Sequence, residues 1–293
     1  MEIMISRKAP SDESTSWDLV ITPRKGWLDI DIAGIWRYRE LVLLFFKRDF
    51  VAFYKQTVLG PAWYLIQPTI TTAAFTLLFS RIARLPTDNV PPVLFYMSGV
   101  VLWNFFGTSL SKTSDTFASN AAIFGKVYFP RLVVPISVVL SNVLTFAIQF
   151  SLLLCALAYF WVGGFDKGFG GYKLGLVIPL LIYVSVLGLG IGIVVSALTV
   201  RYRDLAFVVG FATQLWMYAT PIVYPLSHIP DRWHWLYGLN PMTAPVETFR
   251  RIVLGAGTVT PQLWLSSAII VVTVFFLGLV LFARAEKISM DTV

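Results

Sequence analysis

The side chains that can bind a metal or transfer a proton are few and widely spaced along this chain. The only histidines, His228 and His234, lie in one proline-rich segment. A structural or catalytic metal site needs further ligands close by, so we predict no metal site and expect both histidines at a membrane–water boundary. No two carboxylates lie together inside an apolar stretch, and an embedded general acid–base pair is therefore not expected.

The sequence also lacks the phosphate-binding motif of common nucleotide sites. No segment follows the Gly-x-x-x-x-Gly-Lys-[Ser/Thr] pattern whose backbone cradles phosphates. We therefore expect no cofactor on this chain. Proton- and ion-coupled transporters normally carry ionisable residues within their spans. A transporter without such residues is passive or takes its energy from a partner.

Six apolar stretches that lack Asp, Glu, Lys and Arg dominate the chain. A spanning helix needs about 20 mostly apolar residues, and each stretch reaches that length. Mean hydropathy is +0.72 and only 13% of the residues are charged, against roughly 25% in soluble domains. We predict an all-α integral membrane protein with six transmembrane helices. The stretches are Thr57–Ser80, Asn89–Ser111, Leu132–Phe165, Leu174–Val200, Leu205–Pro230 and Ile252–Ala283.

The segments outside these stretches are short. Residues 1–35 are polar and are expected to form a flexible cytoplasmic tail. Residues 36–57 place Arg37, Lys47 and Arg48 on one helical face, and the opposite face holds Val42, Phe46, Phe50 and Phe53. This pattern predicts an amphipathic helix in the membrane interface, and a helix packed on the bundle is the alternative. Residues 58–283 form the transmembrane domain, and residues 284–293 a cytoplasmic tail.

Basic residues predict the orientation. With six spans and both termini in the cytoplasm, 16 of the 23 Lys and Arg residues face the cytoplasm. The positive-inside rule favours this arrangement. The net charge of +7 is explained by a basic face against anionic membrane lipid, and we predict no nucleic acid as a partner.

The segment between the fifth and sixth stretches is interrupted by prolines. Pro221, Pro225, Pro230, Pro241 and Pro245 forbid one continuous helix. Tryptophan and tyrosine side chains between them are typical of a membrane boundary. We predict re-entrant half-helices that dip into the outer leaflet, and an ordinary outer loop is the alternative.

Several strings resemble the membrane subunit of bacterial ABC exporters for O-antigen and related cell-surface polysaccharides, the Wzm type. The resemblance runs from about residue 36 to residue 283. Its strings are Tyr54-Lys-Gln-Thr-Val-Leu-Gly-Pro-Ala-Trp-Tyr-Leu-Ile-Gln-Pro68, Lys126-Val-Tyr-Phe-Pro-Arg131, Tyr202-Arg-Asp204, Gln214-Leu-Trp-Met-Tyr-Ala-Thr-Pro-Ile-Val-Tyr-Pro225, Leu239-Asn-Pro-Met242 and Glu247-Thr-Phe-Arg250.

The resemblance implies a homodimer in the bacterial inner membrane with two copies of a cytoplasmic ATPase. It also implies export of polyprenyl-pyrophosphate-linked polysaccharide through a channel between the permease halves. Aromatic side chains can stack on sugars while the chain slides; the candidates are Trp63, Tyr64, Trp103, Phe106, Trp216 and Tyr218. The re-entrant segment would form a periplasmic gate, with the candidates Tyr224, Trp233, Trp235, Tyr237, Glu247 and Arg250.

The resemblance also assigns the segment from Asp115 to Pro130 as a coupling helix. Because its apolar side chains have no evident reason to face water, we expect them to dock into the ATPase. The coupling candidates are Phe117, Ile123, Phe124, Lys126, Arg203 and Asp204. Lys47, Arg48 and Lys55 are candidates for the lipid pyrophosphate or for anionic headgroups.

Other functions stay open at this point. A related permease would carry teichoic acid, a capsule polysaccharide or a drug. From a different class, a membrane-embedded glycosyltransferase or acyltransferase would need carboxylates or histidines at one membrane face. Asp204, Asp231 and Glu247 are instead divided between opposite sides of the predicted bundle.

Overall fold

Helices make up all the regular structure in the described part of the chain. The computed structural model describes residues 32–56, 59–127, 129–165, 171–202 and 204–291. The all-α class predicted from the sequence is confirmed for these residues. In chain order the helices are α1 (Ile32–Arg37), α2 (Arg39–Gln56), η1 (Gly60–Ala62), α3 (Trp63–Phe75), η2 (Thr76–Ile82), α4 (Pro92–Ser114), α5 (Thr116–Phe124), α6 (Val133–Val162), η3 (Gly171–Leu176), α7 (Val177–Thr199), α8 (Leu205–Ala219), η4 (Leu226–His228), η5 (Asp231–Trp233), α9 (His234–Gly238), α10 (Thr243–Leu254) and α11 (Pro261–Asp291).

Four helices are long and apolar enough to cross a membrane. They are α4, α6, α7 with the turn before it, and α11, and each coincides with one of the predicted stretches. Proline lies at the start of α4 and α11, where its missing N–H and fixed φ are tolerated. The C-terminal helix continues to Asp291, well past Ala283, where the sixth stretch was expected to end.

The other two predicted spans are not single long α-helices. The α3 helix has 13 residues and continues as a π-helix, η2, of seven residues. The α8 helix has 15 residues and ends at Ala219, so the helical part of the fifth stretch ends well before Pro230. Pro221 and Pro225 follow directly, and neither can continue a helix. Ile252 likewise belongs to α10 rather than to the start of the last long helix.

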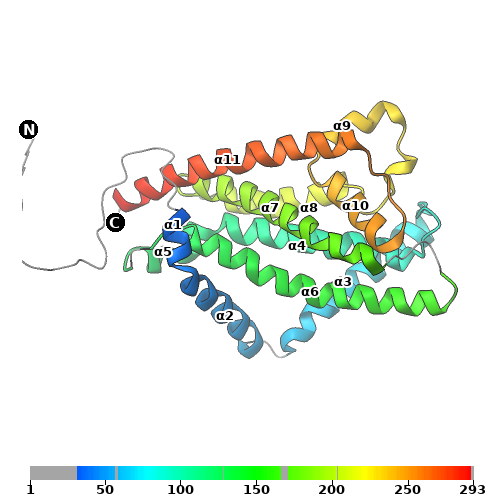
Figure 1. Ribbon diagram of the computed structural model, residues 1–293, viewed down its shortest axis with the longest axis horizontal. Coiled ribbons are helices and arrows are strands. Elements are labelled where there is room, and N and C mark those ends of the chain that lie inside the picture. The colour runs from blue at the N-terminus through cyan, green and yellow to red at the C-terminus, as the bar shows by residue number, and fades with distance from the viewer. Residues whose placement is uncertain (1–31, 57–58, 128, 166–170, 203, 292–293) are drawn as a thin grey trace, which may run out of the picture.

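The long helices lie side by side along one axis of the molecule (Figure 1). One end of this bundle carries α1, α5 and the end of α11, and we call it the α5 end. The opposite end carries α9 and α10, and we call it the α10 end (Figure 1). The α4 helix lies in the middle, packed against α3, α6, α7, α8 and α10. It supplies more buried side chains to the main hydrophobic core than any other helix.

Small residues let α7 approach a neighbour on each of two sides. A Cβ on Gly192 would lie 2.5 Å from the Thr113 Cβ of α4, and one on Gly188 would lie 3.3 Å from the Ser109 Cβ. On the other side, a Cβ on Gly278 of α11 would meet the Gly190 carbonyl oxygen at 2.7 Å. The glycine pattern of α7 therefore serves close packing within the protomer.

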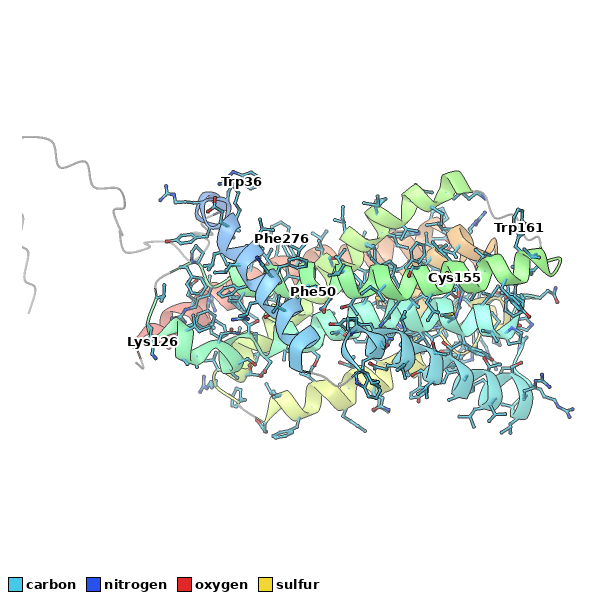
Figure 2. The ribbon with its side chains drawn as sticks, turned by 90° about the horizontal axis from the view of Figure 1, so that it is seen from below. Trp36, Phe50, Lys126, Cys155, Trp161 and Phe276 are labelled. Carbon is cyan, nitrogen blue, oxygen red and sulfur yellow. The ribbon has the colours of Figure 1, made fainter. Side chains whose placement is uncertain are left out.

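The α2 helix packs obliquely on α6 near the α5 end (Figure 2). Val42 and Phe45 are buried against Phe129, Val133 and Val134. The predicted apolar face is therefore only partly correct: it includes Val42, but Phe45 takes the central contact and Phe50 is exposed. The alternative of a helix packed on the bundle agrees with these contacts, although the exposed Leu43 and Leu44 still suit a membrane surface.

Candidate functional site

The α10 end is built around the chain between α8 and α10. Asn240 joins α8 to the start of α10. Its Oδ1 accepts from the Trp216 Nε1–H of α8 and from the backbone N–H of Met242, each at 3.0 Å. Its Nδ2 donates to the Thr220 Oγ1 at 2.9 Å. Ser267 of α11 donates to the Pro241 carbonyl at 2.7 Å. Side chains of this segment and of α11 thus satisfy the Met242 N–H and the Pro241 carbonyl, as buried non-helical backbone requires.

A buried ion pair, Glu247 and Arg250, anchors α10 in this region. Arg250 is 1% exposed and Glu247 is also 1% exposed, and their Nη1 and Oε1 atoms are 3.1 Å apart. The guanidinium also donates to the carbonyl oxygens of Pro221 and Ile222. Its carbon lies 3.8 Å from the ring centroid of Phe95 on α4. Arg250 therefore connects α10, α4 and the irregular segment that follows α8.

The surroundings of this pair are shaped to hold it. Glu247 Oε2 accepts from the Thr258 backbone N–H at 2.7 Å. A Cβ on Gly99 would lie 2.8 Å from Ile222 Cγ2 and 3.2 Å from Arg250 Nη2. Glycine is thus required on α4 where the arginine passes.

The remaining gate candidates lie nearer the surface. Tyr237 donates to the Tyr224 hydroxyl at 3.0 Å, and Tyr224 donates to the Tyr218 carbonyl at 3.1 Å. Trp233 and Trp235 are exposed, as residues at a membrane boundary would be. The structure therefore divides the six candidates into a buried ion pair, a tyrosine pair and two exposed tryptophans.

The histidines contact acidic residues of the same end. His228 Nδ1 lies 3.5 Å from an oxygen of Asp88, and His234 Nδ1 lies 3.7 Å from an oxygen of Asp231. Among the described residues, no group of three or more His, Cys, Asp or Glu side chains is placed to hold a metal ion. Each histidine thus belongs to a local surface pair.

At the α5 end, the expected coupling residues pack within the protomer. Phe117 is buried, with its ring centroid 4.8 Å from that of Phe282 of α11. The Phe124 ring lies 5.9 Å from Phe117 and 5.7 Å from Phe129. Ile123 packs on the α2–α6 cluster. These side chains therefore contact residues of their own chain, and docking of this segment into the ATPase stays a prediction.

Arg131 reinforces this aromatic packing, and the sequence pattern did not predict such a buried structural role for it. Its side chain is 5% exposed, and its guanidinium carbon lies 5.1 Å from the Phe124 ring centroid and 5.7 Å from that of Phe117. Nη1 donates to the Glu286 carbonyl at 3.3 Å. Burial lowers the pKa of Arg131, and Glu286 opposes this shift. A buried arginine therefore ties α5 to the end of α11.

The other basic candidates are exposed at the same end. Lys126, Lys47 and Arg48 have exposed side chains, as has Asp204. Arg48 pairs with its neighbour Asp49 at 2.8 Å and lies over the Phe45 ring at 4.7 Å. The Lys55 side chain and the whole of Arg203 lie outside the described residues.

The aromatic channel candidates fall into two groups. Trp103, Phe106 and Trp216 form one cluster inside the protomer, with Phe106 and Trp216 ring centroids 5.1 Å apart. Trp103 and Phe106 are buried and Trp216 is half-buried, so Trp103 and Phe106 do not reach the surface of this protomer. Trp63 and Tyr218 are exposed.

Tyr64 lines a small cavity of about 70 Å³ between α2, α3, α4 and α6. Asp49 and Lys112 line the same cavity. This cavity is formed within the protomer, among four of its helices, and Tyr64 is half-buried there. The six candidates are therefore not brought together on one surface.

An exposed apolar surface near these aromatics belongs to α8. None of its residues from Leu205 to Ala219 is buried. Its contacts are made with α4 and α7 on one side, while the large side chains on its other sides are exposed. These are Phe207, Val208, Phe211, Leu215 and Tyr218.

Comparison with known proteins identifies the family. The sequence model of the ABC-2 type transporter family matches residues 40–254. An O-antigen export system permease protein RfbA from Myxococcus xanthus is 29% identical over 225 residues, which is 75% of this chain and 83% of that protein. A protein of the same name from Klebsiella pneumoniae is 27% identical over 216 residues, 73% of this chain and 80% of that protein. The chain therefore belongs to the ABC-2 type transporter family, as a membrane subunit.

Proposed function

We propose that this chain is the permease subunit of an ATP-driven exporter of O-antigen-type polysaccharide carried on polyprenyl pyrophosphate. The observation that carries the proposal is the similarity to O-antigen export permeases over about three quarters of the chain. Because the chain is a membrane subunit of a transporter family, a membrane-embedded transferase is no longer favoured. ATP and Mg would be bound by a separate cytoplasmic ATPase, present in two copies.

The proposed topology has six crossings with the α5 end in the cytoplasm. The α3 and η2 segments follow each other without a break and total about 30 Å at the usual helical rise. The α8 helix covers about 22 Å and is continued by the buried residues Thr220 to Val223. The exposed basic residues of the α5 end, among them Lys47, Lys126 and Arg284, satisfy the positive-inside rule.

The path for the polysaccharide would lie between two copies of this chain in the inner membrane. The α8 face supports this proposal, because it is apolar and exposed in the part of the chain that the structure describes. Tyr218 and Trp63 are the expected channel aromatics that are exposed. Aromatic rings offer a sugar chain a flat apolar contact without fixed hydrogen bonds, which suits a chain that must slide.

Force from the ATPase would enter through the exposed face of α5. That face consists of small residues, Ala118, Ser119, Ala121 and Ala122, which allow close approach by a partner. The opposite face holds Phe117 and joins α11 through the Phe282 ring. In this form of the proposal, the buried phenylalanines transmit motion, and the exposed residues with Lys126 bind the ATPase.

The α10 end would close the periplasmic side of the path. The α10 helix packs beside the first turns of α4, because Arg250 lies over Phe95 and beside Gly99. If α4 spans the membrane, α10 therefore lies within the outer half of the bilayer. This placement supports a re-entrant half-helix, whose irregular flanks are satisfied by protein as membrane depth requires.

Deletion of the chain in the bacterium that makes it tests the function. Loss of surface polysaccharide, together with accumulation of polyprenyl-linked polysaccharide in the cytoplasm, is the expected result. The affinity-purified chain should bring a separate ATPase with it and hydrolyse no ATP when that subunit is removed. Unchanged surface polysaccharide would contradict the proposed substrate, and loss of a capsule or teichoic acid alone would reassign it.

A further inference from the structure

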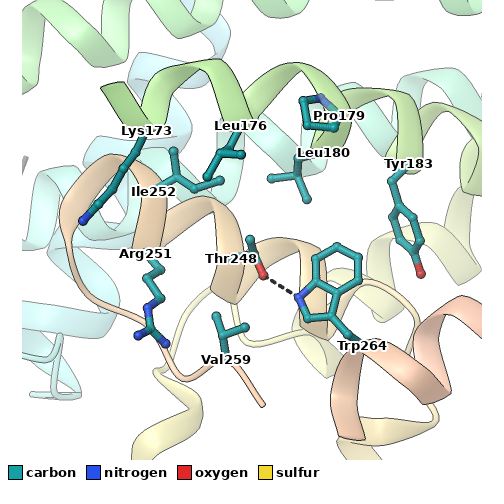
Figure 3. A pocket seen from close by; sticks show the side chains of 10 residues that line it. All are labelled: Lys173, Leu176, Pro179, Leu180, Tyr183, Thr248, Arg251, Ile252, Val259 and Trp264. Atoms are coloured by element: carbon teal, nitrogen blue, oxygen red, sulfur yellow. Dashed lines mark hydrogen bonds between the residues drawn. The ribbon is translucent and has the colours of Figure 1, made fainter. Parts of the chain in front are cut away.

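A pocket of about 600 Å³ opens between α7, α10 and α11 at the α10 end. This volume lies within the range of about 300–1,000 Å³ typical of small-molecule sites. Figure 3 shows Lys173 and Arg251 at one end of the pocket and Tyr183 and Trp264 at the other. The remaining lining residues are apolar except for one threonine: Leu176, Pro179, Leu180, Thr248, Ile252 and Val259.

The pocket exists because two tightly packed helices separate toward this end. Gly190 and Gly278 bring α7 and α11 into backbone contact near their middles. Farther along, Tyr183 reaches α11 with its side chain: its ring centroid lies 5.0 Å from that of Trp264, and its hydroxyl lies 2.6 Å from Ser267 Oγ. The α10 helix closes the back of the resulting wedge, where Trp264 Nε1–H donates to Thr248 Oγ1 at 3.0 Å (Figure 3).

The chemistry of the lining is that of an amphiphile site. One end offers two cationic side chains, while the floor and the far end offer aliphatic and aromatic surface. Leu176, Pro179 and Arg251 are exposed, so the pocket is open to the outside of the protomer. The outer faces of the adjoining helices, at Ile182 of α7 and Leu265 and Ile269 of α11, are exposed and apolar. An entering molecule would therefore come from the lipid phase.

We propose that this pocket binds one anionic phospholipid of the outer leaflet. An acyl chain would fill the apolar part, and the phosphate would lie between Lys173 and Arg251, whose long side chains can reach a headgroup. The lipid would contact α10 at Thr248, Arg251 and Ile252, a different face of the helix from that of Glu247 and Arg250. This site is separate from the path proposed for the polysaccharide and does not depend on its identity.

Quenching of Trp264 by brominated lipid measures the occupancy directly. The full-length protein is placed in phosphatidylcholine nanodiscs that contain phosphatidylglycerol with brominated acyl chains. The signal of Trp264 is the difference between each protein and its Trp264→Phe counterpart. We expect brominated phosphatidylglycerol to bind at least about 5-fold more tightly than brominated phosphatidylcholine, since one cation near an anionic surface contributes roughly that factor.

Three variants separate the pocket from general surface attraction. K173Q/R251Q should remove the preference for phosphatidylglycerol, whereas Arg232→Gln, an exposed cation of the same end outside the pocket, should retain it. Val259→Phe keeps both cations but fills the apolar part, and should reduce quenching by either lipid. Equal quenching by both lipids in the unmodified protein would overturn the proposal. So would a preference that survives K173Q/R251Q, or quenching that Val259→Phe leaves unchanged.

Discussion

Replacing Arg250 by methionine tests the assignment of the Glu247–Arg250 pair as the anchor of the α10 end. Methionine keeps much of the volume and removes the guanidinium. The change eliminates the donors to the Pro221 and Ile222 carbonyls and the contact with the Phe95 ring. It also leaves Glu247 buried with the Thr258 N–H as its remaining partner at 2.7 Å.

The size of the effect follows from these contacts. A hydrogen bond to a charged group contributes about 1.5–3 kcal/mol, and removing one partner of a buried ion pair costs about 3–5 kcal/mol. We expect Arg250→Met to lower the free energy of unfolding by about 4 kcal/mol, because these losses overlap. In a chain of this size, 1 kcal/mol shifts the Tm by about 2–4 °C, so the expected decrease is about 10 °C.

The assay is thermal unfolding of the purified protein in detergent, followed for four variants. Arg232→Met is the matched control, because that arginine is exposed, and its Tm should change by less than about 2 °C. The double variant Glu247→Gln/Arg250→Met should lose about 2 kcal/mol less than the sum of the two single variants, since it no longer buries an unpaired charge. A Tm for Arg250→Met equal to that of the control would refute the reasoning, as would strict additivity in the double variant.

Three further outcomes are expected. Periplasm-active reporters should be active after residues 88, 168 and 257 and silent after 120, 203 and 290; an active fusion at the C-terminus would reverse the orientation. Cysteines at His228 and His234, which are partly exposed, should react with membrane-impermeant reagents, whereas a cysteine at the buried Ile222 should not; uniform labelling would indicate a plain outer loop. Phe117→Ala should lower the protein's Tm, because it removes a buried ring at a cost of about 3–5 kcal/mol, whereas Lys126→Glu should weaken copurification of the ATPase at unchanged Tm; the reverse pattern would contradict the division of α5 into two faces.

The long helices were predictable because each is a continuous apolar segment of membrane-spanning length. The stretches that became α4, α6, α7 and α11 contain no Asp, Glu, Lys or Arg over a length sufficient for a span. Helix ends were less predictable, since apolar residues continue beyond the break. Residues such as Ile222 and Val223 follow Ala219 and are buried in irregular chain, so hydropathy extended α8 across a boundary that only the prolines indicate.

The side-chain partners could not be read from periodicity. Phe46 and Phe50 lie opposite the charged face of α2, yet Phe45 makes the buried contact because α2 docks onto Phe129 of a distant segment. Phe117 likewise meets Phe282, which lies far away in the chain. The available signal for the ion pair was the i, i+3 spacing of Glu247 and Arg250, but the burial of the pair depends on contacts with α4.

The proposed coupling and gate regions are joined by α4. Its first turns contact Arg250 through Phe95 and Gly99, and its last residue is separated from α5 by Asp115 alone. With 23 residues, α4 covers about 35 Å at the usual rise. One continuous helix therefore extends from the face proposed to receive force to the pair that holds α10.

Packing makes local bending of that helix costly. Gly188 and Gly192 of α7 lie against Ser109 and Thr113 with no space for even a Cβ at Gly192, and close-packed interiors transmit displacement rather than absorb it. A movement imposed on α5 would therefore reach Phe95 as a shift of the whole of α4. Hydrogen bonds weaken steeply beyond their usual distances, so a shift of about 1 Å would suffice to weaken the contacts of Arg250. The buried pair is thus placed where ATPase motion at one end could release α10 at the other.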